Sequence, residues 1–218
     1  MIRVSAFKWV PPFVQGLVRD LRVRWALEEA GERYEERLLG GADPSASDYR
    51  AMQPFGQVPT YEEDDLVMFE SGAIVLRIAE RSPTLLPREP KARARAISWL
   101  FAAINSIEPY TDVVVDIDLF HANEAWAKER RPGALRQAEE RLATIERVLT
   151  GREYLEGAFS AGDLMMTTVL RTLRHTNVVA QFSALAAYQQ RCEARPAFQR
   201  ALAAHMAVFA KHAPPPKS

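Results

Sequence analysis

The sequence predicts an α/β domain followed by an all-helical domain, and three observations lead to this fold class. Strand-like and helix-like stretches alternate over residues 1–82. Three prolines then lie within residues 83–90, where they block helix continuation and indicate a linker. Beyond the linker, over residues 91–212, apolar residues recur three and four positions apart, which is the spacing of helices. The remaining residues, 213–218, are expected to form a disordered tail.

The first domain is expected to begin with a βαβ unit. β-branched and aromatic residues predict a strand at Ile2–Phe7. Apolar residues at helical spacing, with charged residues between them, predict an amphipathic helix at Val14–Glu29. Gly31 stands where such a helix ends in a left-handed residue. A second strand is expected at Tyr34–Leu39.

A ββα unit is expected to complete this domain, after a turn-rich stretch with a short helix around Ser45–Met52. An acidic turn separates Val58–Glu62 from Leu66–Phe69, which is the pattern of an antiparallel hairpin. Ser71 follows as a good N-cap residue for a helix at Gly72–Arg81.

Helices account for the regular patterns of the second domain. Apolar spacing predicts helices at Ala92–Tyr110 and Ala134–Leu149. Val113–Phe120 has strand propensity, but its position between helices favours a helix.

A capping box is expected at the start of a central helix, Ala161–Leu173. There the Ser160 hydroxyl can accept from the amide of Asp163, while the carboxylate of Asp163 accepts from the amide of Ser160. Two further helices are expected at Ser183–Ala194 and Ala197–Phe209.

Composition excludes several classes of protein. The 28 Lys and Arg residues balance the 28 Asp and Glu residues, so the chain lacks the positive net charge of a typical nucleic-acid-binding protein. Because 48% of the residues are hydrophobic, the composition is not that of a disordered protein. No apolar stretch reaches the roughly 20 residues of a membrane helix, and the first residues do not resemble a signal peptide, so a cytoplasmic protein is expected. Cys192 is the only cysteine and the four histidines form no close pair, so we expect no disulfide and no bound metal.

Five segments of the sequence resemble the soluble glutathione S-transferase family in its bacterial type. In chain order they are Arg22–Gly31 (RVRWALEEAG), Pro54–Thr60 (PFGQVPT), Phe69–Ile74 (FESGAI), Phe159–Asp163 (FSAGD) and Arg195–Leu202 (RPAFQRAL). The resemblance implies a thioredoxin-like first domain, an all-helical second domain and a homodimer. It also implies glutathione as co-substrate and an electrophilic, mostly apolar small molecule as its partner in the reaction.

Residues that match the family's glutathione site are Gln57, Val58, Pro59, Glu70 and Ser71. A cis peptide before Pro59 would turn the Val58 amide and carbonyl outward, toward the cysteinyl part of the tripeptide. Ser71 at a helix start favours the γ-glutamyl carboxylate, Glu70 would hold the ammonium group, and Gln57 another polar group. Three of these residues also have a purely structural alternative. Pro59 could be an ordinary edge-strand proline, Ser71 a plain N-cap, and Glu70 a charge that complements the helix dipole.

The hydroxyl or thiol that usually activates glutathione is missing. The thiolate is the nucleophile, and lowering a thiol pKa of about 8.5 by two units takes about 2.7 kcal/mol. The family supplies a Tyr at the end of the first strand, or a Ser or Cys at the start of the first helix. Residues 6–33 contain no Ser, Thr, Tyr or Cys, and the corresponding positions hold Phe7, Leu17 and Arg19.

Several groups could take over this role. Arg19 has the most favourable electrostatics, because a fixed cation can stabilise a thiolate more strongly than a neutral donor does when water is excluded. The indole N–H of Trp9, the backbone amides of Gly16–Val18 and the hydroxyl of Ser5 are the other candidates. Arg19 and Trp9 are therefore our tentative thiolate stabilisers, although Arg19 could equally be a solvated charge or the partner of a carboxylate.

The function predicted from these residues is glutathione transfer in detoxification, with the thiol attacking an electrophile. The alternative is a non-catalytic module that keeps the fold, for glutathione binding or for protein contacts. A thiol-disulfide oxidoreductase would need a cysteine near the first helix, and the sequence has none there.

Overall fold

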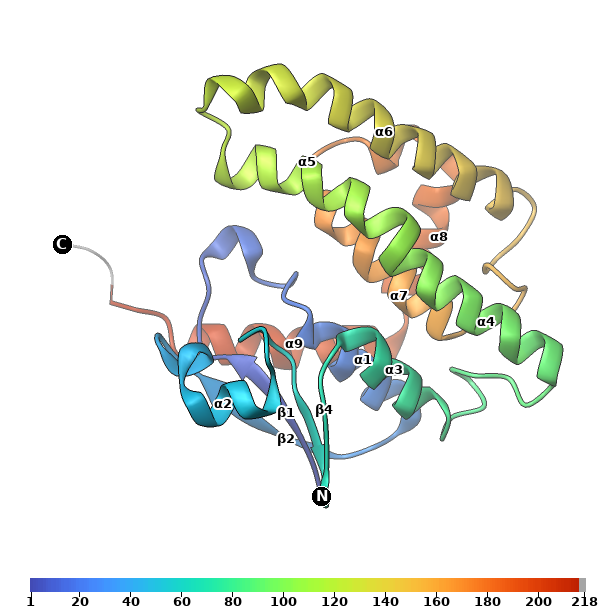
Figure 1. Ribbon diagram of the computed structural model, residues 1–218. Coiled ribbons are helices and arrows are strands. Elements are labelled where there is room, and N and C mark those ends of the chain that lie inside the picture. Colours follow the sequence, from blue (N-terminus) through green and yellow to red (C-terminus); the bar gives the residue numbers. More distant parts are fainter. Residues whose placement is uncertain (216–218) are drawn as a thin grey trace. The chain divides into compact units, whose positions relative to one another are not determined.

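The computed structural model describes residues 1–215, which fold into two compact units (Figure 1). The N-terminal unit combines residues 1–82 with the segment that begins at Pro196, and the helical unit comprises residues 83–195. This grouping differs from the predicted domains in one respect, because the last helix joins the N-terminal unit. Of the predicted tail, residues 213–215 have no regular secondary structure, and 216–218 lie outside the described residues.

A four-stranded sheet of order β2-β1-β3-β4 forms the centre of the N-terminal unit. Strands β1 (Ile2–Phe7) and β2 (Tyr34–Leu39) are parallel, whereas β3 (Tyr61–Glu63) and β4 (Leu66–Met68) form an antiparallel hairpin next to β1. The order βαβ followed by ββα confirms the predicted α/β fold class.

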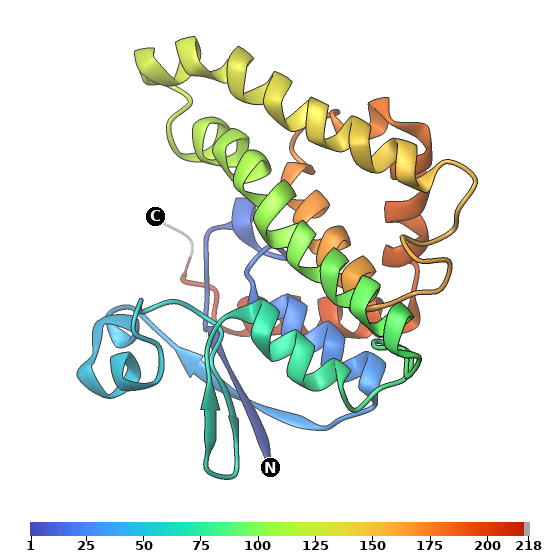
Figure 2. The same ribbon diagram turned by 45° about the vertical axis from the view of Figure 1, so that its right-hand side comes forward.

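Helices α1 (Asp20–Ala30) and α3 (Ser71–Ala79) lie side by side against the sheet, whereas α2 (Ser47–Met52) lies apart from them (Figure 2). Helix α9 (Pro196–Lys211) packs along α1. The packing is apolar, since the two helices bury large side chains such as Trp25 and Phe198 against each other. This contact explains why α9 groups with the N-terminal unit.

The first helix is shorter than the sequence predicts. It was expected at Val14–Glu29, but the α-helix begins only at Asp20, after a 3-10 turn at Pro12–Val14. Gly16 between them has φ +78°, a left-handed conformation that a right-handed helix cannot pass through. At the other end the prediction is confirmed, because Gly31 caps the helix with φ +72°.

Two other boundaries in this unit differ from the prediction. Strand β3 begins at Tyr61 instead of Val58, because the amide of Thr60 donates to the Ser5 hydroxyl and Pro59 has no amide hydrogen. Ser71 is the first residue of α3 and not its N-cap, which is Glu70.

Within the helical unit, residues 83–195 contain helices and no strand. Its main elements are α4 (Pro90–Ala102), α5 (Glu108–Phe120), α6 (Ala125–Leu149), α7 (Ala161–Leu170) and α8 (Ser183–Glu193), with α5 packed along α6 and α7 packed on α4 (Figure 1). The helix preferred for Val113–Phe120 is confirmed.

The single helix predicted for Ala92–Tyr110 is interrupted by a π-helical turn at Ala103–Ile107. Pro109 in the first turn of α5 accounts for the interruption. It has no amide to donate to the residue four positions earlier, and its ring clashes with that carbonyl, so the turn widens.

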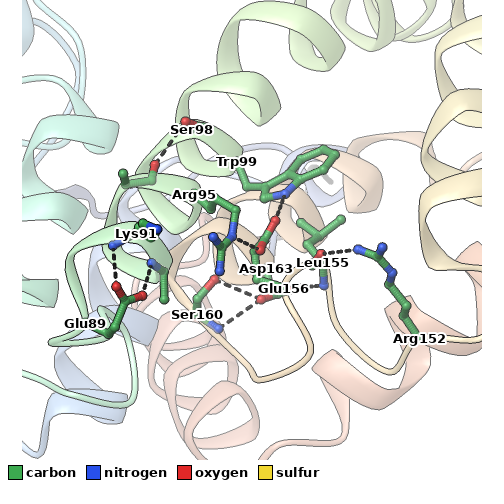
Figure 3. Close-up of polar contacts among 12 residues, drawn as sticks. Glu89, Lys91, Arg95, Ser98, Trp99, Arg152, Leu155, Glu156, Ser160 and Asp163 are labelled. Carbon is green, nitrogen blue, oxygen red and sulfur yellow. Dashed lines mark hydrogen bonds and ion pairs between the residues drawn. The ribbon is translucent and has the colours of Figure 1, made fainter.

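The predicted capping box at the start of α7 is confirmed (Figure 3). The Asp163 carboxylate accepts from the amide of Ser160 at 2.9 Å, and the Ser160 hydroxyl accepts from the amide of Gly162 at 3.2 Å. Asp163 also accepts from the amide of Leu155 at 2.9 Å and from the hydroxyl of Tyr188 at 3.1 Å. Burial raises the pKa of the Asp163 carboxyl, and these donors oppose that shift.

Three further findings bear on function. None of the helices in residues 1–215 is long and apolar enough to cross a membrane. The same residues contain no group of three or more His, Cys, Asp or Glu side chains placed to hold a metal ion. Cys192 is fully buried, and desolvation raises the pKa of its thiol to about 12, as expected for a small apolar core residue.

Candidate functional site

A short backbone segment before β3 is open to hydrogen bonding. The peptide bond between Val58 and Pro59 is cis, and both residues are buried. Among the described residues, neither the amide nor the carbonyl of Val58 has a hydrogen-bond partner. This edge can therefore pair with the backbone of an added peptide, as an extra strand would.

The open segment is fixed on both sides by Ser5 and Tyr49. The Tyr49 hydroxyl donates to the carbonyl of Gln57 at 2.6 Å and lies 2.9 Å from the Ser5 hydroxyl. Thr60 is tied to Ser5 twice, because its amide donates to the Ser5 hydroxyl at 2.6 Å and its carbonyl accepts from the Ser5 amide at 3.0 Å. Burial raises the pKa of Tyr49, which keeps its hydroxyl protonated as a donor.

These bonds remove Ser5 from the candidate thiolate stabilisers. Its side chain is fully buried, and its hydroxyl is engaged by Tyr49 and Thr60. The hydroxyl supports the shape of the Val58 segment and is not available to a bound thiol.

The hairpin and the end of β1 both lead to the open segment. Tyr61 of β3 pairs with Met68 of β4, so the Val58 segment before β3 and the chain after β4 leave the hairpin at the same end. Val58 is buried in a cluster with Leu39 and Tyr49, and Phe7 at the end of β1 packs against this cluster. The end of β1 therefore lies beside the open segment.

Glu70 has a strained backbone, with φ +68° and ψ +110°. A non-glycine residue in such a conformation costs about 1–3 kcal/mol, and residues of this kind cluster at functional sites. The side chain of Glu70 is exposed and has no partner among the described residues. The sequence indicated Glu70 as a candidate but gave no sign of this strain.

Helix α3 presents a positive end next to Glu70. Its first internal hydrogen bond runs from the amide of Ile74 to the carbonyl of Glu70 at 3.0 Å, so the amides of Ser71, Gly72 and Ala73 precede it without a helical acceptor. Three amides and the helix dipole favour an anion at this point. A carboxylate is a suitable ligand because it accepts several hydrogen bonds at once.

The Ser71 side chain also contacts α1, which the sequence did not predict. Nη1 of Arg22 donates to Oγ of Ser71 at 3.2 Å, and the two residues are 3% and 6% exposed. One signal for Arg22 was present in the sequence. It lies three and four positions before the core residues Trp25 and Ala26, and a cation on the core face of a helix calls for an explanation.

The tentative thiolate stabilisers stand on the connection between β1 and α1. Trp9 follows β1 and is half-buried, and its indole has no hydrogen-bond partner among the described residues. Arg19 is the N-cap residue of α1, is half-buried, and is engaged in further interactions. Of the amides of residues 16–18, that of Leu17 is engaged, because it donates to the carbonyl of Val14 at 3.0 Å.

Comparison with known proteins gives a consistent result. Residues 21–90 match the family model described as the N-terminal domain of glutathione S-transferase. Glutathione S-transferase 4 of Zea mays is 30% identical over 207 residues, which cover 89% of each sequence.

One solved structure and one further relative extend this comparison. The theta class glutathione S-transferase of Xanthomonas axonopodis pv. citri, solved with glutathione bound, is 27% identical, with a TM-score of 0.77 over 92% of this chain and 96% of that one. A stringent starvation protein A homolog of Pasteurella multocida is 27% identical over 189 residues, covering 83% of this chain and 84% of that protein.

Proposed function

The chain belongs to the glutathione S-transferase family, and from this premise we propose that its N-terminal unit binds glutathione between the Val58 segment and the start of α3. The function is glutathione transfer, in which the thiol of the tripeptide attacks an electrophilic small molecule. The observation that carries the proposed site is the backbone of Val58, whose amide and carbonyl have no partner among the described residues.

Each group of the tripeptide has a complementary group in this site. The backbone of Val58, supported by Pro59, pairs with the cysteinyl residue as an added strand would. The amides at the start of α3 and the Ser71 hydroxyl donate hydrogen bonds to the γ-glutamyl carboxylate. The exposed carboxylate of Glu70 pairs with the α-ammonium group, and the exposed side chain of Gln57 contacts another polar group of the ligand.

Thiolate formation depends on the connection between β1 and α1. A charged hydrogen bond contributes about 1.5–3 kcal/mol and an exposed helix start about 0.3–1 kcal/mol, so one donor together with the dipole reaches the roughly 2.7 kcal/mol needed. Arg19 and Trp9 are the donors we propose. Trp9 follows β1 and Arg19 precedes α1, so both belong to the connection that begins at Phe7, which packs beside Val58, where the cysteinyl sulfur would lie.

Calorimetry with glutathione tests the binding site, using Ser71→Ala as the variant and Ser98→Ala as its control. Ser98 is an exposed serine whose hydroxyl donates within its own helix. We expect Ser71→Ala to weaken binding by about 1–3 kcal/mol and Ser98→Ala to leave it unchanged. Equal affinities in all three proteins would remove Ser71 from the site.

A non-catalytic glutathione-binding or protein-interaction module is the second candidate, and one observation favours it. Residues 6–33 lack the hydroxyl or thiol that usually activates glutathione. Ultraviolet titration of bound glutathione separates the two functions. A thiol pKa lowered by about two units supports the transferase, and the value of free glutathione supports the binding module.

The remaining parts of the proposal concern partners and location. We propose a mostly apolar electrophile, a homodimer, a role in detoxification and a cytoplasmic location, the last because a lone cysteine forms no internal disulfide. Light scattering tests the dimer, since a monomer mass would contradict it.

A further inference from the structure

Arg22 is a buried cation in contact with Ser71, at the proposed carboxylate site. It projects from the first turn of α1, is 3% exposed, and donates from Nη1 to Oγ of Ser71 at 3.2 Å. The bond joins two helices that lie side by side in the N-terminal unit (Figure 2). Its guanidinium has five N–H donors and no acceptor, so it can act on Ser71 only as a donor.

The hydrogen bond from Arg22 determines whether the Ser71 hydroxyl acts toward a ligand as a donor or as an acceptor. Oγ accepts from Arg22, so one of its lone pairs is occupied and its own hydrogen points elsewhere. Among the described residues, that hydrogen has no acceptor. The hydroxyl can therefore act as a donor to a ligand at the start of α3.

The charge that attracts a carboxylate to this helix start also comes from α1. The first turn of α3 reads Ser71, Gly72, Ala73 and Ile74, and none of these residues is basic. The dipole of α3 and the amides provide partial charges only. The guanidinium of Arg22, which also interacts with other residues, lies against the hydroxyl in a buried position where solvent screens charge less than at the surface.

We propose that Arg22 is a positioning residue for glutathione, which acts through Ser71 to select a ligand with a free α-carboxylate on the γ-glutamyl group. The inference rests on the proposed function, since it assigns that carboxylate to the start of α3. Arg22 donates to Ser71 and holds its hydroxyl hydrogen toward the ligand. It also sets the local potential for the anion.

The test compares two ligands and needs no activity measurement. Glutathione is compared with γ-aminobutyryl-cysteinylglycine, which lacks only the α-carboxylate, and the ratio of their affinities is measured by calorimetry for each protein. We expect Arg22→Met to weaken glutathione binding on the order of tenfold or more and to leave the analogue's affinity unchanged. The ratio should therefore fall toward one.

Three further variants make the result specific. Arg77→Met removes a cation from the last turn of the same helix as Ser71 and should keep the wild-type ratio. Arg22→Met combined with Ser71→Ala should show less than the sum of the two single losses, because Arg22 acts through Ser71. If Arg22→Met does not fold, Arg22→Lys is measured instead, and its ratio should lie below that of the wild type.

The outcomes separate this inference from the proposed function. Failure of the wild-type protein to bind glutathione would overturn the proposed function, and this inference with it. If the wild type binds, then an unchanged ratio in Arg22→Met, or in Arg22→Lys where Met does not fold, overturns the role of Arg22 alone. An equal loss of both ligands does the same, because it shows a general structural effect.

Discussion

The ring of Phe198 packs edge-on against the ring of Trp25, with the two ring centroids 4.7 Å apart. Both side chains are fully buried, and they join the last helix of the chain to the first. Nearby, Nε of Arg200 donates to the Glu28 carboxylate at 2.7 Å. The aromatic pair is the buried part of this contact, so most of its stabilisation should come from the rings and little from the exposed ion pair.

Truncation of Phe198 should therefore destabilise the N-terminal unit. We expect Phe198→Ala to lower the free energy of unfolding by about 3–5 kcal/mol, because it leaves a cavity beside Trp25. Met206→Ala on the exposed side of α9 is the control and should change it by less than about 1 kcal/mol. Urea denaturation followed by tryptophan fluorescence measures both, and similar losses would show that α9 is not anchored by this pair.

Two glycine substitutions in the helical unit should act in opposite directions. A Cβ at Gly162 would lie 2.7 Å from the Cβ of Trp99 and 3.1 Å from the carbonyl of Ala96, so α7 meets α4 there without room for a methyl group. We expect Gly162→Ala to destabilise the protein by about 1–3 kcal/mol. At Gly133, inside α6, the nearest atom is the mobile end of Arg130, and Gly133→Ala should stabilise by about 0.5–1 kcal/mol. Thermal unfolding measures both shifts.

We expect the folding stability of the protein to fall at acidic pH as Asp118 becomes protonated. Its carboxylate accepts from Arg131 at 2.6 and 2.9 Å and lies 3.2 Å from His175, and the hydrogen bonds from Arg131 are the main reason that its pKa is lowered. A lowered pKa in the folded state adds stability above the unfolded value of about 3.9, and this stability is lost as the pH falls through the folded value.

Asp118→Asn should therefore lower the melting temperature at pH 7 and flatten its decline between about pH 5 and pH 3. Asp116→Asn, on the same helix but with a side chain that is 58% exposed, should keep the wild-type profile. A wild-type profile in Asp118→Asn would show that the pair with Arg131 does not contribute.

Removal of the Arg19 cation should raise the pKa of the bound thiol. Arg19→Ala takes away a charge at the start of α1, and under the proposed assignment this charge is the most favourable electrostatic partner of the glutathione thiolate. Trp9→Phe removes only the indole N–H and should produce a smaller rise. Ultraviolet absorbance of the thiolate measures both, and if neither variant shifts the pKa, backbone amides at the start of α1 must hold the sulfur.

Regular patterns made most of the fold predictable. The order βαβ and then ββα, the left-handed Gly31 and the capping box of Ser160 and Asp163 follow from local chemistry that a single segment carries. The ends of helices and strands were less predictable where a residue far away in the sequence takes a backbone hydrogen bond. Strand β3 starts late because the side chain of Ser5 takes the amide that a neighbouring strand would use.

The candidate site was predictable only in part. Val58 and Ser71 could be chosen from their segments, but the contact between Arg22 and Ser71 depends on how α1 packs against α3, and a side-chain contact between two helices has no fixed spacing in sequence. The strain at Glu70 could not be foreseen either, because nothing about a glutamate before a serine requires a positive φ.

Because Cys192 lies in the interior, we expect the native protein not to react with thiol reagents near neutral pH. It is the sole cysteine of the chain, and its proton is held until about pH 12. Any thiol that ionises near neutral pH while the protein remains folded therefore belongs to glutathione, which lets the ionisation of its thiol be followed without replacing any residue.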